Sequence, residues 1–356
     1  MEAYDNGVRH VELLDPEGNS FSLAEAAPGF ETAWAFRYPS CSSALPEPIR
    51  QVSPSDVWGP VRARNYSPGG TSMSTRHRWI TVDGIETFYR EAGPADGPIV
   101  LLPHGYPSSS FEFRDLMPAL ADRWRTIAPD LPGFGYSDAP ADFAYTFDGY
   151  SEFLRRFAEA LELTEYVIYL HDYGSQFGLR LAIDAPERVR GLIFQNGDIY
   201  EDEHGPKYAP LKQFWNNPTE QGRAYLAAAV SEAGFRGEFL GELPDHLVDR
   251  VSPDLWKLAW SVTSPPQRQA NLVNLLADQR HTVAWFPVQQ AYLREHRPPT
   301  LIIWGRNDGY MPEPAARAYH RDHPDAELHV FDGGHWLLET HLDEVVPLIR
   351  EFLDRL

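Results

Sequence analysis

Six short apolar runs, separated by stretches with helical spacing, constrain the fold of this chain more than any other feature. The runs are apolar on both faces, which is typical of strands in a parallel sheet covered by helices. Between two of them, Phe153, Leu154, Phe157 and Leu161 repeat at the spacing of one helix face. This alternation predicts an α/β fold with a mostly parallel central sheet and helices on both faces. The predicted strands are residues 98–102, 124–129, 166–170, 191–195, 300–304 and 327–331.

The remaining sequence divides into an extension, a split core and an insertion. Residues 1–75 are an N-terminal extension, irregular where proline and serine are dense, with two strands expected around a turn at 15–19. Whether this extension is flexible or docked through Trp34, Phe36 and Trp58 stays open. The core consists of residues 76–197, which start with a hairpin at Asp83-Gly84, and residues 297–356. Residues 198–296 are aromatic-rich with helical spacing, and we interpret them as a helical cap.

Composition excludes several classes of function. The chain has 31 Lys and Arg against 51 Asp and Glu, a net charge of −20, which argues against binding nucleic acid or an anionic membrane. No apolar run reaches the roughly 20 residues that span a bilayer, and the first residues lack the order of a secretory signal. The single cysteine, Cys41, excludes an internal disulfide. Without a span, a signal or a disulfide framework, we expect a cytoplasmic protein. No motif predicts a metal or a cofactor, the expected partner is a small molecule, and a homodimer stays open.

The most informative motif is the segment His171-Asp172-Tyr173-Gly174-Ser175, which follows an apolar strand and precedes a helix. A sharp strand–turn–helix with small residues after its central position is typical of a nucleophile elbow. The central residue is Asp172, and a carboxylate there can attack an alkyl carbon to form a covalent ester. Two alternatives are Ser175 as the nucleophile, which would put bulky residues at the small positions, and Asp172 as a simple helix cap.

A second motif, His104-Gly105-Tyr106-Pro107, follows the strand at residues 98–102. The amides of Tyr106 and Tyr173 are expected to form an oxyanion hole. His104 is interpreted as shaping this loop and bordering the substrate pocket, although a role as a base stays open.

Two more strands end in glycine-marked loops that carry Asp308 and His335. Ligands bind at this edge of open α/β sheets, and the order Asp172, Asp308, His335 is that of a nucleophile–acid–histidine triad. Because Asp172 is already an anion, His335 is expected to deprotonate the water that hydrolyses the ester, with Asp308 orienting the ring. Asp198 is a rival for the acid.

Together these motifs resemble the α/β-hydrolase superfamily, in its epoxide hydrolase and haloalkane dehalogenase branch. The resemblance covers residue 77 to the end and implies a lid inserted after the sixth strand. It rests on HGYPSSSFEFR (104–114), DLPGFGYSD (130–138), LHDYGSQFG (170–178), WGRND (304–308) and GGHWLLE (333–339).

Within this branch the motifs look most like epoxide hydrolases. Haloalkane dehalogenases carry a tryptophan after the nucleophile and fluoroacetate dehalogenases an arginine, whereas this chain has Tyr173. Epoxide hydrolases protonate the leaving oxygen with cap tyrosines, and the position of one of them is Gln279 here, which can donate a hydrogen bond but no proton. The predicted cap donors are Tyr200, Tyr208, Tyr225 and Gln279, with Tyr292 and His281 as further candidates. The predicted pocket residues are His104, Phe214, Trp215 and Trp336.

The sequence therefore predicts a hydrolase that opens an epoxide of an apolar or aromatic substrate through an ester on Asp172. Dehalogenation by the same displacement and ester or lactone hydrolysis are alternatives. A different class, a non-hydrolytic cyclase or a ligand-binding protein on the same fold, is also compatible with Gln279. The substrate and the role of residues 1–75 are not predicted.

Overall fold

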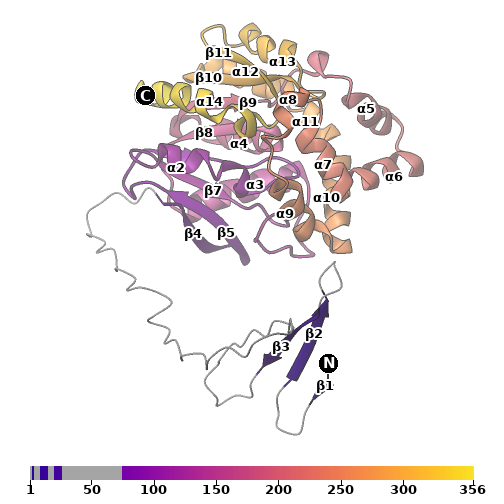
Figure 1. The fold of residues 1–356 in the computed structure, drawn as a ribbon. Coiled ribbons are helices and arrows are strands. Elements are labelled where there is room, and N and C mark those ends of the chain that lie inside the picture. The colour runs from indigo at the N-terminus through magenta and orange to yellow at the C-terminus, as the bar shows by residue number, and fades with distance from the viewer. Residues whose placement is uncertain (1, 4–8, 15–19, 26–73) are drawn as a thin grey trace. The chain divides into compact units, whose positions relative to one another are not determined.

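The computed structural model describes residues 2–3, 9–14, 20–25 and 74–356, and the chain divides into two compact units, Met1–Tyr66 and Ser67–Leu356. In the first unit, β1 (Glu2–Ala3), β2 (Arg9–Leu14) and β3 (Ser20–Glu25) form an antiparallel sheet (Figure 1). Both strands expected near the N-terminus are thus present. The turn predicted at 15–19, and Trp34, Phe36 and Trp58, lie outside the described residues.

An eight-stranded sheet organises the second unit, in the order β11-β10-β9-β8-β6-β7-β5-β4. The hairpin β4–β5 and the pair β5–β7 are antiparallel, and all other pairs are parallel. Asp83 and Gly84 form the hairpin turn with positive φ angles of 48° and 84°, as such two-residue turns require. The strands are β4 (Arg76–Val82), β5 (Ile85–Ala92), β6 (Ile99–Leu101), β7 (Arg125–Pro129), β8 (Tyr166–His171), β9 (Val189–Gln195), β10 (Thr300–Asn307) and β11 (Glu327–Gly334).

Helices cover both faces of this sheet, because alternate residues of each strand point to opposite sides. Leu101, Ile168 and Ile302 pack in the same core as α3 (Phe147–Ala160) and α4 (Asp172–Asp184). Their neighbours Val100 and Val167 pack instead with α2 (Leu116–Leu120) and α14 (Leu337–Asp354). The predicted fold is confirmed. Three short elements and α13 complete the core: η1 (Ser110–Phe113), η2 (Pro186–Arg188), α13 (Glu313–Ala318) and η4 (Tyr319–Arg321). The short helix η3 (Glu201–Glu203) follows β9, at the start of the insertion.

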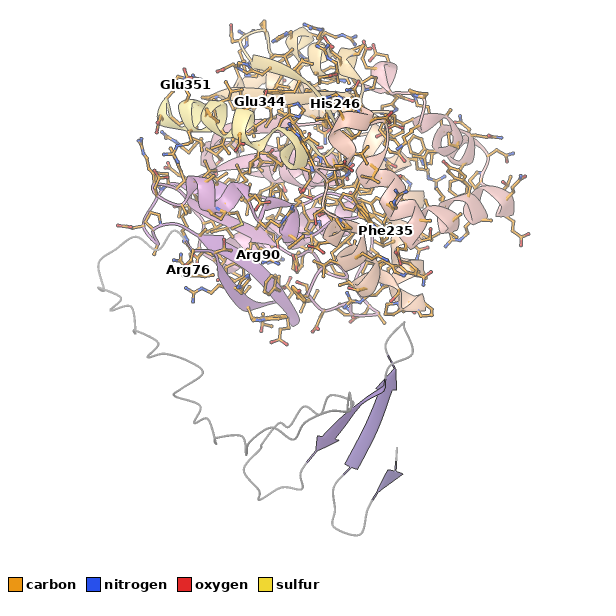
Figure 2. All side chains as sticks on the ribbon, viewed as in Figure 1. Arg76, Arg90, Phe235, His246, Glu344 and Glu351 are labelled. Carbon is orange, nitrogen blue, oxygen red and sulfur yellow. The ribbon has the colours of Figure 1, made fainter. Side chains whose placement is uncertain are left out.

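All regular elements between β9 and β10 are helices. Figure 2 shows Phe235 within these helices, on the side of the unit that also carries His246, while Arg76 and Arg90 mark the hairpin β4–β5. Across the described ranges, no helix is both long and apolar enough to cross a bilayer. The helices are α5 (Tyr208–Asn216), α6 (Glu220–Ala229), α7 (Glu232–Leu240), α8 (Asp245–Val248), α9 (Asp254–Thr263), α10 (Pro266–Asp278), α11 (Arg280–Val283) and α12 (Phe286–His296).

Candidate active site

Asp172 stands at a strained turn where β8 ends and α4 begins. Its φ angle is +47°, a conformation that residues with a side chain rarely adopt and that clusters at functional sites. The turn is tight because a Cβ on Gly174 would come within 2.1 Å of the Pro103 carbonyl oxygen. Ser175 is fully buried and its hydroxyl donates to the backbone carbonyl of Asp172. The elbow therefore presents Asp172, and it uses Ser175 to hold the turn.

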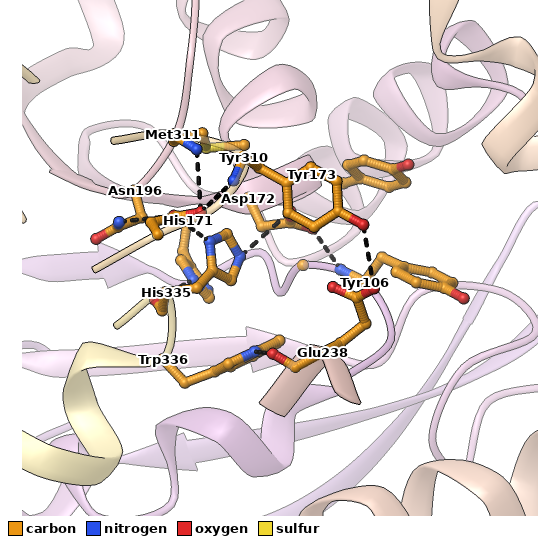
Figure 3. Close-up of polar contacts among 12 residues, drawn as sticks. Tyr106, His171, Asp172, Tyr173, Asn196, Glu238, Tyr310, Met311, His335 and Trp336 are labelled. Atoms are coloured by element: carbon orange, nitrogen blue, oxygen red, sulfur yellow. Dashed lines mark hydrogen bonds and ion pairs between the residues drawn. The ribbon is translucent and has the colours of Figure 1, made fainter. Parts of the chain in front are cut away.

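The Asp172 carboxylate is buried and held from two sides (Figure 3). The amide of Tyr106 donates to Oδ1 at 2.6 Å, and Nε2 of His335 lies 3.4 Å from Oδ2. Among the described residues, the structure records a hydrogen bond to this carboxylate from Tyr106 and not from the amide of Tyr173. Gly105 allows this approach, since a Cβ there would lie 2.5 Å from Cβ of Asp172.

Asp308 orients His335 through a 2.7 Å contact between Oδ2 and Nδ1. Burial opposes ionisation of Asp308, but the contact to His335, the Met311 amide and the Asn196 amide group together lower its pKa to about 2. Burial also opposes the charging of His335, but Asp308 and Asp172 outweigh it and raise the pKa of His335 well above its usual range. The rival acid Asp198 lies beside His204, with 2.8 Å between Oδ2 and Nε2, so the geometry pairs Asp308 with His335.

Above Asp172 lies a cavity that encloses about 610 Å³, part of it open to solvent. Its polar groups include the hydroxyl of Tyr106, which is buried without a hydrogen-bond partner, and the carboxyl group of Glu238. The core contributes Tyr106, Asp172, Tyr173, Tyr310, Met311 and His335 to the walls, and the inserted helices and their flanks contribute Tyr208, Leu211, Tyr225, Leu226, Ala229, Glu238, Leu276 and Gln279.

Gln279 connects two tyrosines on the cavity wall. The hydroxyl of Tyr173 donates to Oε1 of Gln279 at 3.0 Å, and Nε2 of Gln279 donates to the hydroxyl of Tyr208 at 3.2 Å. Because Tyr208 accepts from Gln279, its own proton goes to a different acceptor, and the Asp198 carboxylate is within reach of it. Gln279 thus sets the direction of this hydrogen-bond chain.

The predicted cap donors separate into two groups. Tyr208, Tyr225 and Gln279 line the cavity, and Tyr225 is half exposed. Tyr200 does not line it: its hydroxyl donates to Asp322, because the segment before α5 runs over the core helices. Tyr292 stacks on His296, away from the cavity wall.

The predicted pocket residues need correction as well. His104 accepts from the amide of Leu131 and supports the loop, so it borders no part of this cavity. Phe214 packs against Gly222, and Trp336 donates to the backbone carbonyl of Glu238 and packs against the ring of Phe239 at a tilt. Trp215 alone of the four reaches a neighbouring smaller cavity of about 270 Å³, which Asp172 and Tyr173 also line.

Sequence reasoning missed Glu238, Tyr310 and Asn196. Tyr310 follows Asp308 by two residues, and its amide donates to the Asp308 carboxylate at 2.8 Å. This turn of the loop places the ring of Tyr310 on the cavity wall. Asn196 lies at the end of β9 with a positive φ of 40°, a strand-end position that could have drawn attention. No local pattern distinguishes Glu238 from the other acidic residues of the insertion. In the described ranges, no group of metal ligands occurs.

Comparison with known proteins agrees with this geometry. Residues 98–342 match the family described as alpha/beta hydrolase fold. The chain belongs to this family. This α/β-hydrolase is 31% identical to the uncharacterized hydrolase YNR064C of Saccharomyces cerevisiae, over 77% of this chain and 97% of that protein. It is 33% identical to haloalkane dehalogenase 2 of Mycobacterium tuberculosis, over 81% of this chain and 98% of the relative.

The fold is shared with solved structures of the same branch. The epoxide hydrolase CorEH superposes with a TM-score of 0.65 at 20% identity, over 79% of this chain and 99% of that one. The expected membership of the epoxide hydrolase and haloalkane dehalogenase branch is confirmed, and the chain is an α/β-hydrolase enzyme.

Proposed function

We propose that this α/β-hydrolase opens an epoxide on an apolar or aromatic substrate through a covalent ester on Asp172. One observation carries the proposal: the cavity places a carboxylate nucleophile opposite hydroxyl and carboxyl groups that can donate a proton. Leu211, Leu226 and Leu276 supply apolar walls for the rest of the substrate. Residues 198–296 act as the cap that closes the site.

In the first half-reaction, Asp172 attacks a ring carbon of the epoxide. The carbon–oxygen bond breaks, its electron pair moves to the oxygen, and the oxygen takes up a proton from the cavity wall. The Tyr106 amide holds Oδ1 at 2.6 Å and so fixes the direction of the carboxylate. The product of this step is a hydroxyalkyl ester of Asp172.

In the second half-reaction, His335 removes a proton from water, and the resulting hydroxide attacks the ester carbonyl. Formation of the ester has removed the charge of Asp172, so the pKa of His335 falls from its raised value and the ring can serve as a base. The Tyr106 amide now donates to the oxyanion of the tetrahedral intermediate. Collapse of that intermediate releases the diol and restores the Asp172 carboxylate.

Displacement of halide is a second candidate, because one observation favours it. Nε1 of Trp215 is buried without a hydrogen-bond partner in the small cavity beside Asp172, where it could donate to a halide. Two observations oppose a halide site. The hydroxyl of Tyr173 already donates to Gln279 and cannot also donate to a halide, and a carboxyl group, Glu238, lines the main cavity. Release of halide from a haloalkane measures this activity directly.

A single turnover in heavy-oxygen water tests the covalent route. The first diol formed should carry unlabelled oxygen from Asp172, and solvent label in that diol would refute the proposal. His335→Gln should stop ester hydrolysis but not ester formation, so a mass adduct should accumulate on the peptide that contains Asp172.

His329→Gln is the matched control, since His329 lies on β11, partly exposed, and pairs with Glu327. This control variant should turn over without accumulating the adduct. Loss of both adduct and activity in His335→Gln, with the fold intact, would mean that His335 acts before the ester forms.

A further inference from the structure

Glu238 is the only carboxyl group, besides Asp172, among the described residues that line the main cavity. It lies on α7, its side chain is only 20% exposed, and it shares the cavity with Asp172 and His335. Tyr310 donates its hydroxyl to Oε1 of Glu238 at 3.1 Å (Figure 3). The other oxygen, Oε2, forms a long ion pair with Nζ of Lys207 at 3.9 Å, beyond hydrogen-bond distance. One oxygen thus accepts a hydrogen bond from Tyr310, and the other, which accepts no hydrogen bond among the described residues, can carry a proton.

The groups around Glu238 act on its pKa in both directions. Burial raises its pKa most, Lys207, the Tyr310 hydroxyl and His335 act to lower it, and Asp172 raises it further. Lys207 is in turn shared with Glu242, whose Oε1 lies 3.3 Å from Nζ. The net result is a pKa of Glu238 above its usual range.

Resting on the proposed epoxide opening, we propose that Glu238, oriented by Tyr310, is the acid that protonates the leaving oxygen. A carboxylic acid suits this task better than the tyrosines of the cavity. Burial raises the pKa of Tyr106 and of Tyr208 well above 10, whereas a general acid works best with a pKa near the operating pH. The tyrosines then hydrogen-bond the oxygen, and Glu238 supplies the proton.

Protons and charges balance over the cycle. When the ester forms, Asp172 loses its negative charge, the proton of Glu238 moves to the oxygen of the opened ring, and Glu238 becomes the anion. His335 then gives its proton to Glu238 and becomes the neutral base that the second step needs. Of the two protons of the attacking water, one ends on His335 and one on the released diol. The starting state returns, with Asp172 ionised, His335 charged and Glu238 neutral.

Glu238→Gln tests the assignment, because the amide keeps the size of the side chain but cannot release a proton. The measurement is the single-turnover rate at which the mass adduct forms on the peptide with Asp172. We expect a fall of about 100-fold or more, within the range typical of a lost general acid. Glu242→Gln is the matched control, since it removes the same charge beside Lys207 outside the substrate cavity, and its rate should match wild type at low pH.

The choice of substrate separates proton delivery from a structural effect. A trifluoromethyl-substituted epoxide leaves a less basic oxygen, so its opening depends less on an acid. Glu238→Gln should lose far less rate with this substrate than with the unsubstituted epoxide. An equal loss for both substrates, or a loss below tenfold for both, would overturn the assignment.

The pH profile gives an independent readout that does not depend on the folding of Glu238→Gln. The wild-type rate of ester formation should fall as pH rises through the pKa of Glu238, where the acid is lost. Tyr310→Phe removes a hydrogen bond that lowers this pKa, so the falling limb should move to higher pH. A limb that stays in place in Tyr310→Phe contradicts the inference.

The two proposals fail differently. If wild type forms an ester on Asp172 and Glu238→Gln forms it equally fast, the role of Glu238 is wrong and the proposed function stands. If no epoxide gives an ester in wild type, the proposed function fails and the role of Glu238 fails with it.

Discussion

Asp308→Asn probes how the structure makes His335 a base. Oδ1 of Asp308 accepts from the amides of Tyr310 and Met311, while Oδ2 accepts from Nδ2 of Asn196 at 2.8 Å and contacts Nδ1 of His335 at 2.7 Å. In the variant, the new NH₂ group can face the backbone amides or the position of Oδ2. The first orientation sets it against two donors, so the second is favoured.

In that orientation the NH₂ group donates to Nδ1 of His335, and the ring must carry its proton on Nε2. Nε2 is the atom that faces Asp172, so it can no longer accept a proton from water. The NH₂ group also opposes Nδ2 of Asn196, which cannot turn away because Oδ1 of Asn196 accepts from the Gly305 amide at 2.9 Å. One buried donor is left unsatisfied, at a cost of about 1–3 kcal/mol of stability.

The expected effect on catalysis is larger than the effect on stability. A wrong tautomer in a Ser-His-Asp triad lowers kcat about 10⁴-fold, so we expect ester hydrolysis to slow by about 10³ to 10⁴-fold, or about 4–5.5 kcal/mol. Ester formation should change much less, and the adduct should accumulate.

Quenched-flow sampling with mass spectrometry follows both steps in one experiment. Asp332→Asn is the matched control, because Asp332 is exposed on β11 and contacts Asn307. A variant Asp308→Asn that hydrolyses the ester within tenfold of the wild-type rate would refute this reasoning.

Two further predictions concern other parts of the core. Gly105→Ala would place a Cβ 2.7 Å from Oδ1 of Asp172 and displace the Tyr106 amide, so steady-state kcat should fall about 10²–10³-fold, while Gly237→Ala, at an open position, should retain activity. Glu91 is buried, which raises its pKa, but Arg125 and Arg76 outweigh this and lower the pKa below 4.5. Its contribution to stability is therefore present above pH 4.5 and lost as the pH falls below it, so the free energy of unfolding, from urea titrations, should fall less steeply with acid in Glu91→Gln than in wild type. An identical slope in the two proteins would contradict this prediction.

The sequence predicts the core of this enzyme well because each core feature has a local cause. Strands buried on both faces read as unbroken apolar runs, and the predicted runs match β6 to β11 to within a few residues at their ends. The elbow is recognisable because a glycine is required two positions after Asp172. A Cβ on Gly174 would come within 2.1 Å of the Pro103 carbonyl oxygen. Local sequence is sufficient wherever sterics fix the position of a side chain.

The inserted helices are different because tertiary packing decides which side chain faces the cavity. Tyr200 and Tyr208 are both buried tyrosines eight positions apart, yet one bonds Asp322 and the other lines the cavity. Glu238 offers no pattern at all, since an acidic residue in an amphipathic helix usually faces solvent. Only the position of α7 against the loops that carry Tyr310 and His335 shows that this carboxyl group turns inward.

The two halves of the proposed reaction draw on different parts of the chain. The groups that form and hydrolyse the ester all lie where strands of the sheet end. They are Asp172, Asp308, His335 and the Tyr106 amide. Glu238 and Tyr208, which meet the leaving oxygen, come from the segment between β9 and β10. Substitutions in the insertion that leave Glu238 in place can therefore change which bond is opened while the step that releases the product stays intact. For an engineer, the insertion is the place to vary substrate range, and the sheet loops are the part to leave unchanged.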